Sequence, residues 1–254
     1  MTWNPAQYLK FAGARLRPAV DLLSRVPSEA PTTVFDLGCG AGQTVALLAA
    51  RFPNARIIGI DSSAEMLAKA RQSFPEHQFI AGNIAAFRAV PPAHLVFSNA
   101  ALQWLGDHEN LLPRLLGEVK VGGVLAVQMP RVEDSPRMRS LREIASDPRW
   151  ADRALPLLQP GPLAPAAYYD LLAPGAASLD IWETEYLHVL EGEDPVVEWT
   201  RGAGGAGMLA ALDDRERKDF LARYTAAMRE AYPRRADGTT LLPFRRLFIV
   251  ASRK

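Results

Sequence analysis

The stretch TTVFDLGCGAG, residues 32–42, decides the fold of this chain. Its first half is apolar, and Val34 and Phe35 both favour extended backbone. Asp36 and three glycines at alternate positions follow, and glycine lets a chain turn where a Cβ atom would clash. Residues 43–51, QTVALLAAR, then carry the apolar periodicity of a helix. The stretch therefore predicts a strand, a tight turn and a helix.

The spacing of the glycines distinguishes between two kinds of nucleotide site. A dinucleotide fingerprint, G-x-G-x-x-G, would place its third glycine at position 43, which is Gln43. The pattern here is D-x-G-x-G-x-G, and it resembles motif I of class I S-adenosylmethionine-dependent methyltransferases. The alternative is a turn that needs glycine for geometry alone. The resemblance implies S-adenosylmethionine as the cofactor, with its amino-acid end and its ammonium group held by Asp36, Gly38, Cys39, Gly40 and Gly42.

A second acid follows the next strand. Residues 56–60, RIIGI, predict that strand, and Asp61 comes directly after it. A carboxylate at this edge can accept hydrogen bonds from both ribose hydroxyls, as an acid about 20 residues past the glycines does in dinucleotide sites. Ser62 and Glu65 form an S-x-x-E capping pattern for a helix over residues 63–73, so capping is the alternative. We expect Asp61 and Ser62 to contact the cofactor.

Strand and helix patterns continue to alternate through the first half of the chain. Further strand patterns lie at residues 77–81, 95–98, 124–129, 178–190 and 246–251. The alternation predicts an α/β fold with a doubly wound, mostly parallel sheet and a ligand at the carboxyl ends of the strands. The last two strands would close the seven-stranded sheet as an antiparallel pair, as in the Rossmann-like class I methyltransferases that the chain resembles.

The sequence after the fifth strand no longer alternates between strand and helix patterns, because prolines interrupt its helical patterns. Two amphipathic patterns, at residues 195–201 and 213–232, are separated by the segment GAGGAG. We expect a cofactor-binding core of residues 1–130, 176–191 and 244–254, in which residues 1–30 form helices over the cleft. A helical cap that contacts the substrate is expected over residues 131–175 and 192–243.

Composition limits the function classes. The chain has 254 residues, 48% of them hydrophobic, and a net charge of +1, so it lacks the broad basic field expected of a nucleic-acid binder. It has no apolar run near the roughly 18 residues of a membrane span. We expect a cytoplasmic enzyme with a small-molecule acceptor and with neither nucleic acid nor membrane as a partner. Cys39, the single cysteine, is expected to be a packing residue.

Residues after the third and fourth strands are candidates for the site. The resemblance implies that Asn83 and Ile84 contact the adenine, and that Asn99 and Ala100 lie near the transferred methyl group. Gln103 and Trp104 would line the acceptor pocket, although a core tryptophan is an equal interpretation of Trp104.

His108 raises the question of a general base. It follows Asp107, a residue suited to a helix N-cap. We expect His108 on the exposed first turn of that helix, without a catalytic role.

Longer stretches resemble the trans-aconitate 2-methyltransferase family over nearly the whole chain. They include WNPAQYLKFAGARLRPA at residues 3–19, NAALQWLGDH at 99–108, GGVLAVQMP at 122–130, VVEW at 196–199 and RLFIVA at 246–251. The family implies methyl transfer from S-adenosylmethionine to a carboxylate of a small polycarboxylic acid, in a monomer or loose homodimer. A carboxylate is already ionised at neutral pH and needs only to be positioned, so we expect no catalytic acid or base and no metal.

Arginine forks would hold the other carboxylates of such an acceptor. The candidates for substrate binding in the matching stretches are Tyr8, Arg15, Arg17, Gln103, Trp104, Arg131 and Arg246. Solvated charges and salt bridges are the alternative interpretation of each arginine.

The resemblance is incomplete at one position of the cap. The family carries an arginine where this chain has Ala206, and either Arg131 or Arg137 would replace the lost charge. A pocket rebuilt for a different acceptor is the alternative, with methylation at a hydroxyl, nitrogen or carbon atom. A non-catalytic S-adenosylmethionine-binding protein is the third interpretation.

Overall fold

The structure is a computed structural model that describes residues 16–27, 30–158, 161–200 and 206–254. The described residues form two compact units. Unit 1 contains those up to Pro130 together with Pro162–Thr184 and Arg246–Lys254. Unit 2 contains those of Arg131–Gly161 and Glu185–Arg245.

The secondary structure follows the predicted alternation in the first half of the chain. The strands are β1 (Thr33–Leu37), β2 (Arg56–Asp61), β3 (Gln78–Ala81), β4 (Ala93–Asn99), β5 (Val119–Pro130), β6 (Ala176–Leu190) and β7 (Thr240–Arg253). The α-helices of unit 1 are α2 (Arg17–Arg25), α3 (Gln43–Arg51), α4 (Ala64–Ser73), α5 (His108–Gly117) and α8 (Pro165–Leu172). Those of unit 2 are α6 (Pro136–Ala145), α7 (Ala151–Ala154), α9 (Pro195–Thr200), α10 (Ala206–Ala210) and α11 (Asp214–Ala231). Short 3₁₀ helices are η1 (Ile84–Ala86), η2 (Leu102–Trp104) and η3 (Leu155–Leu157).

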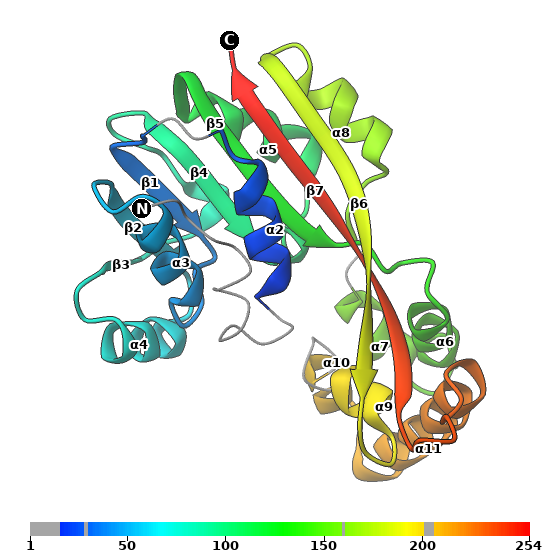
Figure 1. Ribbon diagram of the computed structural model, residues 1–254. Helices are drawn as coiled ribbons and strands as arrows, with labels where there is room; N and C mark the ends of the chain where they lie inside the picture. Colours follow the sequence, from blue (N-terminus) through cyan, green and yellow to red (C-terminus); the bar gives the residue numbers. More distant parts are fainter. Residues whose placement is uncertain (1–15, 28–29, 159–160, 201–205) are drawn as a thin grey trace. The chain divides into compact units, whose positions relative to one another are not determined.

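The seven strands form one sheet in the order β3-β2-β1-β4-β5-β7-β6 (Figure 1). The neighbours from β3 to β5 pair in parallel, whereas β7 pairs antiparallel to β5. Figure 1 draws β6 and β7 running in opposite directions. The predicted mostly parallel, doubly wound sheet with a closing antiparallel pair is therefore confirmed. β7 begins six residues before the predicted position 246, because Leu242 and Phe244 continue its alternation of buried and exposed side chains.

The sheet of unit 1 is covered on both faces. On β1, Phe35 and Leu37 pack in one core cluster with Leu112 of α5 and Tyr168 of α8. The alternate residue Val34 is fully buried without being part of that cluster, and Figure 1 shows α2 on the side of the sheet opposite α5. Burial on both faces is why the central strands are nearly continuous apolar runs.

Helix α8 lies in unit 1, although residues 131–175 were expected to belong to a helical cap. Tyr168 and Leu172 are fully buried among the leucines of α5, including Leu115 and Leu116. The prolines before α8 led to the prediction that this helix belongs to the same region as the helices before it. The apolar face of α8 instead determines that it packs against unit 1.

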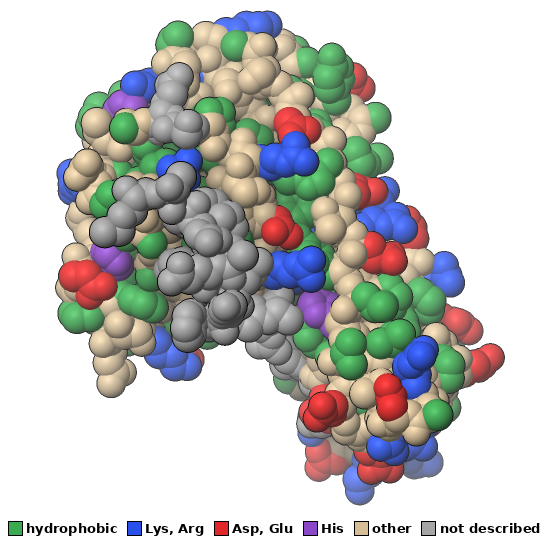
Figure 2. All heavy atoms as spheres, viewed as in Figure 1, with side chains coloured by type: hydrophobic (Ala, Val, Ile, Leu, Met, Phe, Trp, Pro, Cys, Tyr) green, Lys and Arg blue, Asp and Glu red, His purple; other side chains and the backbone are tan. Residues whose placement is uncertain are grey.

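Unit 2 has a separate core. Its buried residues come from helices α6, α7, α9, α10 and α11 and from one end of β7, with Trp150, Phe220, Tyr224 and Phe244 among the largest side chains. On the face shown in Figure 2, lysine and arginine side chains lie among those of aspartate and glutamate. Among the described residues, no helix is both long enough and apolar enough to cross a membrane.

Candidate functional site

The glycine-rich loop joins β1 to α3 in a conformation that only glycine adopts easily. Gly38 has φ of 77°, and a Cβ atom there would lie 2.2 Å from the Cβ of Ala101, in the segment after β4. Gly40 has φ of 54°, and a Cβ atom there would meet no atom of the described residues within 4 Å. The loop is thus packed tightly on one side and faces open space at Gly40, where a ligand can approach the backbone.

Asp36 is the most unusual polar residue of this loop. It is only 1% exposed, and neither of its carboxylate oxygens has a hydrogen-bond partner among the described residues. Burial, with a further contribution from the charge of Asp61, raises the pKa of Asp36 to about 8. A buried carboxylate without donors is unfavourable, so this position is suited to a cationic ligand group.

Asp61 ties the loop to the end of β2. Its Oδ2 accepts a hydrogen bond from the backbone N–H of Gly40 at 2.9 Å, and its Oδ1 accepts one from the N–H of Ser63 at 2.8 Å. Each carboxylate oxygen has a second lone pair, so further donors can still be accommodated. Ser62 is exposed beside it.

The capping pattern predicted for the following helix is displaced by one residue. Ser63, not Ser62, is the N-cap of α4, and its Oγ accepts a hydrogen bond from the N–H of Met66 at 3.3 Å. Glu65 instead pairs with Lys69 at 2.7 Å. The predicted Ser62–Glu65 capping box is therefore wrong, because the chain leaves β2 one residue later than the pattern implied.

Cys39 is buried in the same loop, with 4% of its surface exposed. Its N–H donates to the carbonyl of Ile60 at 3.0 Å. Burial and the charges of Asp36 and Asp61 raise the pKa of the Cys39 thiol well above its ordinary range. The thiol stays protonated at neutral pH, as expected of a small packing residue.

The segment after β3 is fixed by local hydrogen bonds. The side-chain oxygen of Asn83 accepts from the N–H of Ala85 at 2.9 Å and so caps η1. Ile84 is half-buried, packs against the core of unit 1, and has its Cδ1 3.6 Å from the Cβ position of Gly38. Arg114 of α5 donates to the carbonyls of this segment, including that of Ile84 at 3.1 Å. These hydrogen bonds define the backbone at Asn83 and Ile84, and the side chain of Ile84 lies next to the glycine loop.

Buried amide groups gather where β4 and β5 end. Asn99 of β4 pairs with Gln128 of β5, and the N–H of Ala100 donates to the carbonyl of Gln128 at 2.9 Å. Ala100 has φ of 55°, a left-handed conformation that turns the chain out of the strand. Gln103 follows in η2, and its Nε2 donates to the carbonyl of Ala100 at 2.7 Å. These residues form one continuous edge beside the loop.

Several polar atoms at this edge are buried and have no hydrogen-bond partner within the part of the chain that the structure describes. They are Oδ1 of Asn99, Oε1 of Gln103, and both Nε2 and Oε1 of Gln128. Gln128 is fully buried, which makes two unsatisfied atoms on one side chain costly. We did not identify Gln128 from the sequence. The signal for it was a single polar residue near the carboxyl end of the otherwise apolar stretch GGVLAVQMP.

Two residues after β4 differ from expectation. Trp104 is 51% exposed, so its interpretation as a core residue is wrong. His108 is only 4% exposed, so its expected place on an exposed turn is also wrong. Its Nε2 lies 2.9 Å from the carbonyl of Leu102 and its Nδ1 lies against the hydroxyl of Tyr168. Nε2 donates to the carbonyl of Leu102 and Nδ1 is engaged with the hydroxyl of Tyr168, so both ring nitrogens make contacts inside unit 1.

The candidate arginines are divided between the two units. Arg246 of β7 lies in unit 1, opposite Pro130, and is only 7% exposed. Arg17 begins α2, where its exposed side chain approaches Asp21 at 4.0 Å. The alternative interpretation as a surface ion pair fits Arg17 better than substrate binding does. Tyr8 and Arg15 lie outside the described residues.

Arg131 belongs to unit 2. It lines a pocket of about 580 Å³ together with three other arginines, Arg234, Arg235 and Arg245, and two acids, Asp134 and Glu185. The N–H of Arg131 donates to the carbonyl of Arg245 at 3.0 Å. The side chain of Ala206 lies outside what the structure describes, so the effect of the missing arginine there stays a prediction.

Known proteins resemble this chain in sequence and in fold. A family model described as a methyltransferase domain matches residues 34–123. A trans-aconitate 2-methyltransferase from Azoarcus sp. (strain BH72) is 49% identical over 253 residues, which is 99% of each chain. Another from Methylobacterium nodulans is 48% identical and covers 99% of this chain and 98% of its own. The structure of the YcgJ protein from Bacillus subtilis is 14% identical and shares the fold, with a TM-score of 0.60 over 93% of this chain and 98% of that chain. This chain belongs to the trans-aconitate 2-methyltransferase family, within the class I methyltransferases.

Proposed function

We propose that this protein transfers a methyl group from S-adenosylmethionine to a carboxylate of trans-aconitate. Relatives whose names state this activity align with nearly the whole chain, which supports the proposal. The observation that carries it is the carboxylate of Asp36, which is 1% exposed and has no donor to either oxygen among the described residues. A carboxylate in that condition fits the ammonium group of the cofactor.

The residues around the glycine-rich loop would each bind a different part of the cofactor. Asp36 would bind the ammonium group, and the open backbone at Gly40 would accommodate the neighbouring part of the amino acid. Asp61 would use its remaining lone pairs to accept hydrogen bonds from the ribose hydroxyls. The remaining proposed contacts are Gly38, Cys39, Gly42, Ser62, Asn83, Ile84, Asn99 and Ala100. When bound, S-adenosylmethionine supplies a methyl group activated by its sulfonium centre.

On the acceptor side, the chain has to orient a carboxylate and exclude water. Gln103 and Gln128 offer unsatisfied amide atoms at the ends of β4 and β5. Arg246 adds a buried positive charge in the same unit. An ionised carboxylate is already a nucleophile at neutral pH, so these groups need only hold it in place.

The state of His108 favours a carboxylate over a hydroxyl, nitrogen or carbon acceptor. An acceptor that must lose a proton needs a base near the methyl group. Both ring nitrogens of His108 are engaged in hydrogen bonds, to Leu102 and Tyr168. Both nitrogens of the histidine described at the start of α5 are therefore already engaged within unit 1.

The experiment that tests the function is methyl transfer from labelled S-adenosylmethionine. Trans-aconitate is the expected acceptor, with citrate, isocitrate and cis-aconitate as matched comparisons and the product identified by mass. A saturable trans-aconitate monomethyl ester is the expected result. Cofactor binding without any product from these acids would retain the cofactor assignment and contradict the acceptor.

We also propose that the protein acts as a monomer or loose homodimer on a small molecule, without nucleic acid or membrane as a partner. The net charge of +1 and the mixing of charges on the face in Figure 2 support this. Light scattering across a concentration series tests the oligomeric state. A stable assembly larger than a dimer would contradict the proposed monomer or loose homodimer.

A further inference from the structure

The arginine-lined pocket of unit 2 is built entirely by that unit. Its volume is about 580 Å³, and every residue that lines it belongs to the ranges Arg131–Gly161 and Glu185–Arg245. A ligand in this pocket therefore needs no group from the cofactor site of unit 1. Cavities of this size are typical of sites for small organic molecules.

The alternation of side chains along β7 provides one wall of the pocket. Phe244 is buried in the core of unit 2, whereas its neighbours in the strand, Pro243 and Arg245, are exposed and line the pocket. Leu241, two residues earlier on the same face, lines it as well. The N–H of Arg131 donates to the carbonyl of Arg245 at 3.0 Å. Two arginines from distant parts of the sequence thus reach the same pocket.

Two further arginines come from the loop between α11 and β7. Nε of Arg234 donates to the carbonyl of Gly238 at 2.9 Å, and the N–H of Arg235 donates to the carbonyl of Thr239 at 2.8 Å. Asp237, the acid of this loop, accepts from the hydroxyl of Thr239 at 2.7 Å and acts on Arg235 only at longer range. A guanidinium group has five N–H donors, so the contact through Nε leaves other donors of Arg234 for a ligand.

Positive charge exceeds negative charge in this pocket. Four arginines line it against two acids, Asp134 and Glu185, both of which are exposed to solvent. None of the ion pairs among the described residues includes Arg234, Arg235 or Arg245. The ion pairs of unit 2 instead involve Arg149, Arg153, Arg217, Arg223 and Arg229. Like charges that converge on a cavity create a positive potential, which attracts an anion.

The remaining lining of the pocket is largely apolar. It includes Val132, Pro136, Tyr232, Leu241 and Pro243. A carbon skeleton can pack against such side chains while guanidinium forks bind carboxylate or phosphate groups through paired hydrogen bonds. We propose that this pocket binds a small organic anion that carries two or more carboxylate or phosphate groups. This anion is a ligand separate from the cofactor and from the acceptor of methyl transfer, so the site goes beyond the proposed function.

The test compares Arg245→Met with Arg215→Met in the full-length protein without cofactor. Arg215 is an exposed arginine of α11 that does not line the pocket. Isothermal titration with tricarballylate, which has three carboxylates, and with fructose 1,6-bisphosphate, which has two phosphates, distinguishes the two kinds of anion. We expect at least one probe to bind, about 10- to 100-fold more weakly to Arg245→Met and with unchanged affinity to Arg215→Met. Arg245→Lys should fall between, because lysine keeps the charge and loses the fork.

Thermal unfolding separates this binding role from a structural one. Arg245 is exposed, so Arg245→Met should melt at the temperature of the unmodified protein. The probe that binds should raise the melting temperature of the unmodified protein and of Arg215→Met, but not that of Arg245→Met. Equal affinity of the two variants for that probe, or no saturable binding of either probe, would overturn the proposal.

Steady-state kinetics distinguish this pocket from the acceptor site. Arg245→Met should methylate trans-aconitate with an unchanged KM, whereas a KM that rises together with the loss of tricarballylate binding would assign the pocket to the acceptor and overturn a separate site. Loss of probe binding in Arg246→Met but not in Arg245→Met would place the anion in unit 1 and would also overturn it. Probe binding that depends on Arg245, in a protein that does not methylate trans-aconitate, would support the pocket and contradict the proposed function.

Discussion

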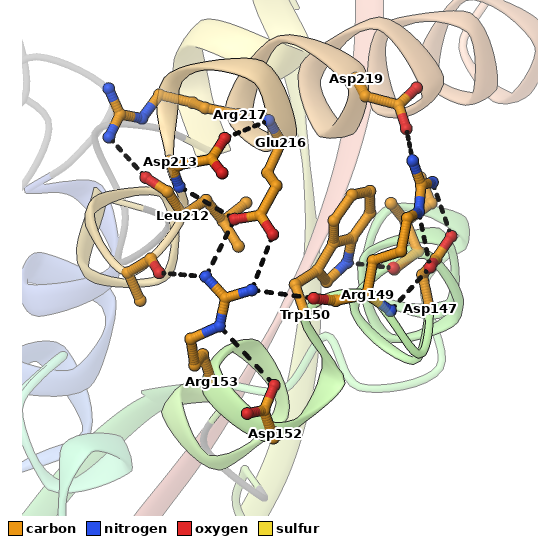
Figure 3. Close-up of polar contacts among 12 residues, drawn as sticks. Asp147, Arg149, Trp150, Asp152, Arg153, Leu212, Asp213, Glu216, Arg217 and Asp219 are labelled. Atoms are coloured by element: carbon orange, nitrogen blue, oxygen red, sulfur yellow. Dashed lines mark hydrogen bonds and ion pairs between the residues drawn. The ribbon is translucent and has the colours of Figure 1, made fainter.

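On the surface of unit 2, Arg149 and Arg153 are paired with carboxylates, whereas the deeply buried carboxylate of Asp36 in unit 1 has no hydrogen-bond partner among the described residues. Figure 3 shows the surface arrangement, in which Arg153 from α7 points its fork at Glu216 of α11 with contacts of 2.7 and 2.9 Å. Arg149 similarly contacts Asp219 at 2.6 Å. Asp36, in contrast, is 1% exposed.

The contrast between exposed, paired charges and a buried, unpaired charge separates surface ion pairs from a charge that is suited to binding a ligand. Exposed ion pairs contribute little to folding stability, because water solvates both partners when the pair is broken. An unpaired buried charge lowers stability, and its natural partner is a ligand of opposite sign. Asp36 would attract a cationic group, which corresponds to the ammonium group of the cofactor.

The largest expected effect is a dependence of stability on pH caused by Asp36. Its pKa of about 8 in the folded protein exceeds the ordinary value of 3.8, so the folded state holds a proton that the unfolded state has lost. The stability from this group is fully present below pH 3.8 and is lost as the pH rises toward 8. Without cofactor, the loss is on the order of 6 kcal/mol between these limits, at about 1.4 kcal/mol per pH unit.

Urea unfolding of the protein and of Asp36→Asn at pH 4, 6 and 8 measures this loss. Other acids titrate in both proteins, so the difference between the two unfolding free energies isolates Asp36. The variant should become the more stable of the two as the pH rises. A difference that stays constant across this range would show that Asp36 is not buried unpaired.

The next largest effect is on cofactor affinity. Asp36→Asn removes the charge that would face the ammonium group, so the dissociation constant of S-adenosylmethionine should rise by at least about 100-fold at pH 8. Isothermal titration checks this, with Asp21→Asn as the control, because Asp21 is a carboxylate of α2 that pairs with Arg17 at 4.0 Å. Equal affinity in the two variants would remove Asp36 from the cofactor site.

A smaller effect is expected at Gln128, which is buried and unsatisfied but uncharged. Gln128→Leu keeps the size of the side chain and removes two unpartnered polar atoms, so stability should change little or rise by up to about 2 kcal/mol. The KM for trans-aconitate should increase by about 10-fold if the amide orients the acceptor. Gln72→Leu, at an exposed position of α4, is the control. Lower stability with normal KM would assign Gln128 to the fold alone.

The smallest effect is expected on the surface of unit 2. Arg153→Met breaks the paired contacts to Glu216 and should lower the unfolding free energy only slightly, because water solvates both groups when they separate. Raising the salt concentration should reduce even that difference. A loss as large as that caused by truncating a buried side chain such as Phe220 would mean that the surface network is as important for folding as the buried core.

The architecture followed from the sequence because its signals are local. The apolar runs of β1 and β2, the glycines between β1 and α3, and the repeated strand-to-helix alternation each lie within a short stretch. In a parallel sheet the carboxyl ends of neighbouring strands lie at the same edge. Asp36, near the end of β1, and Asp61, at the end of β2, were therefore expected close to the glycine-rich loop. The register of β1 with β2 and β4 bears this out.

The features that sequence reasoning missed depend on distant partners. His108 is buried because Tyr168, 60 residues later in the chain, meets its ring. Helix α8 packs in unit 1 in that same contact region, although prolines flank it as they flank the helices of unit 2. Gln128 stands within a matching strand, and only the packing around it shows that its amide has no partner. Local patterns contain no information on these contacts.

The buried thiol of Cys39 has a practical consequence for studies of this protein in solution. It is the only cysteine of the chain, and its burial and raised pKa make it a poor nucleophile toward maleimide reagents. A cysteine introduced on the surface of each unit should therefore accept a fluorescent dye with little background from the native thiol. The chain is thus suited to single-molecule distance measurements without removal of its own cysteine.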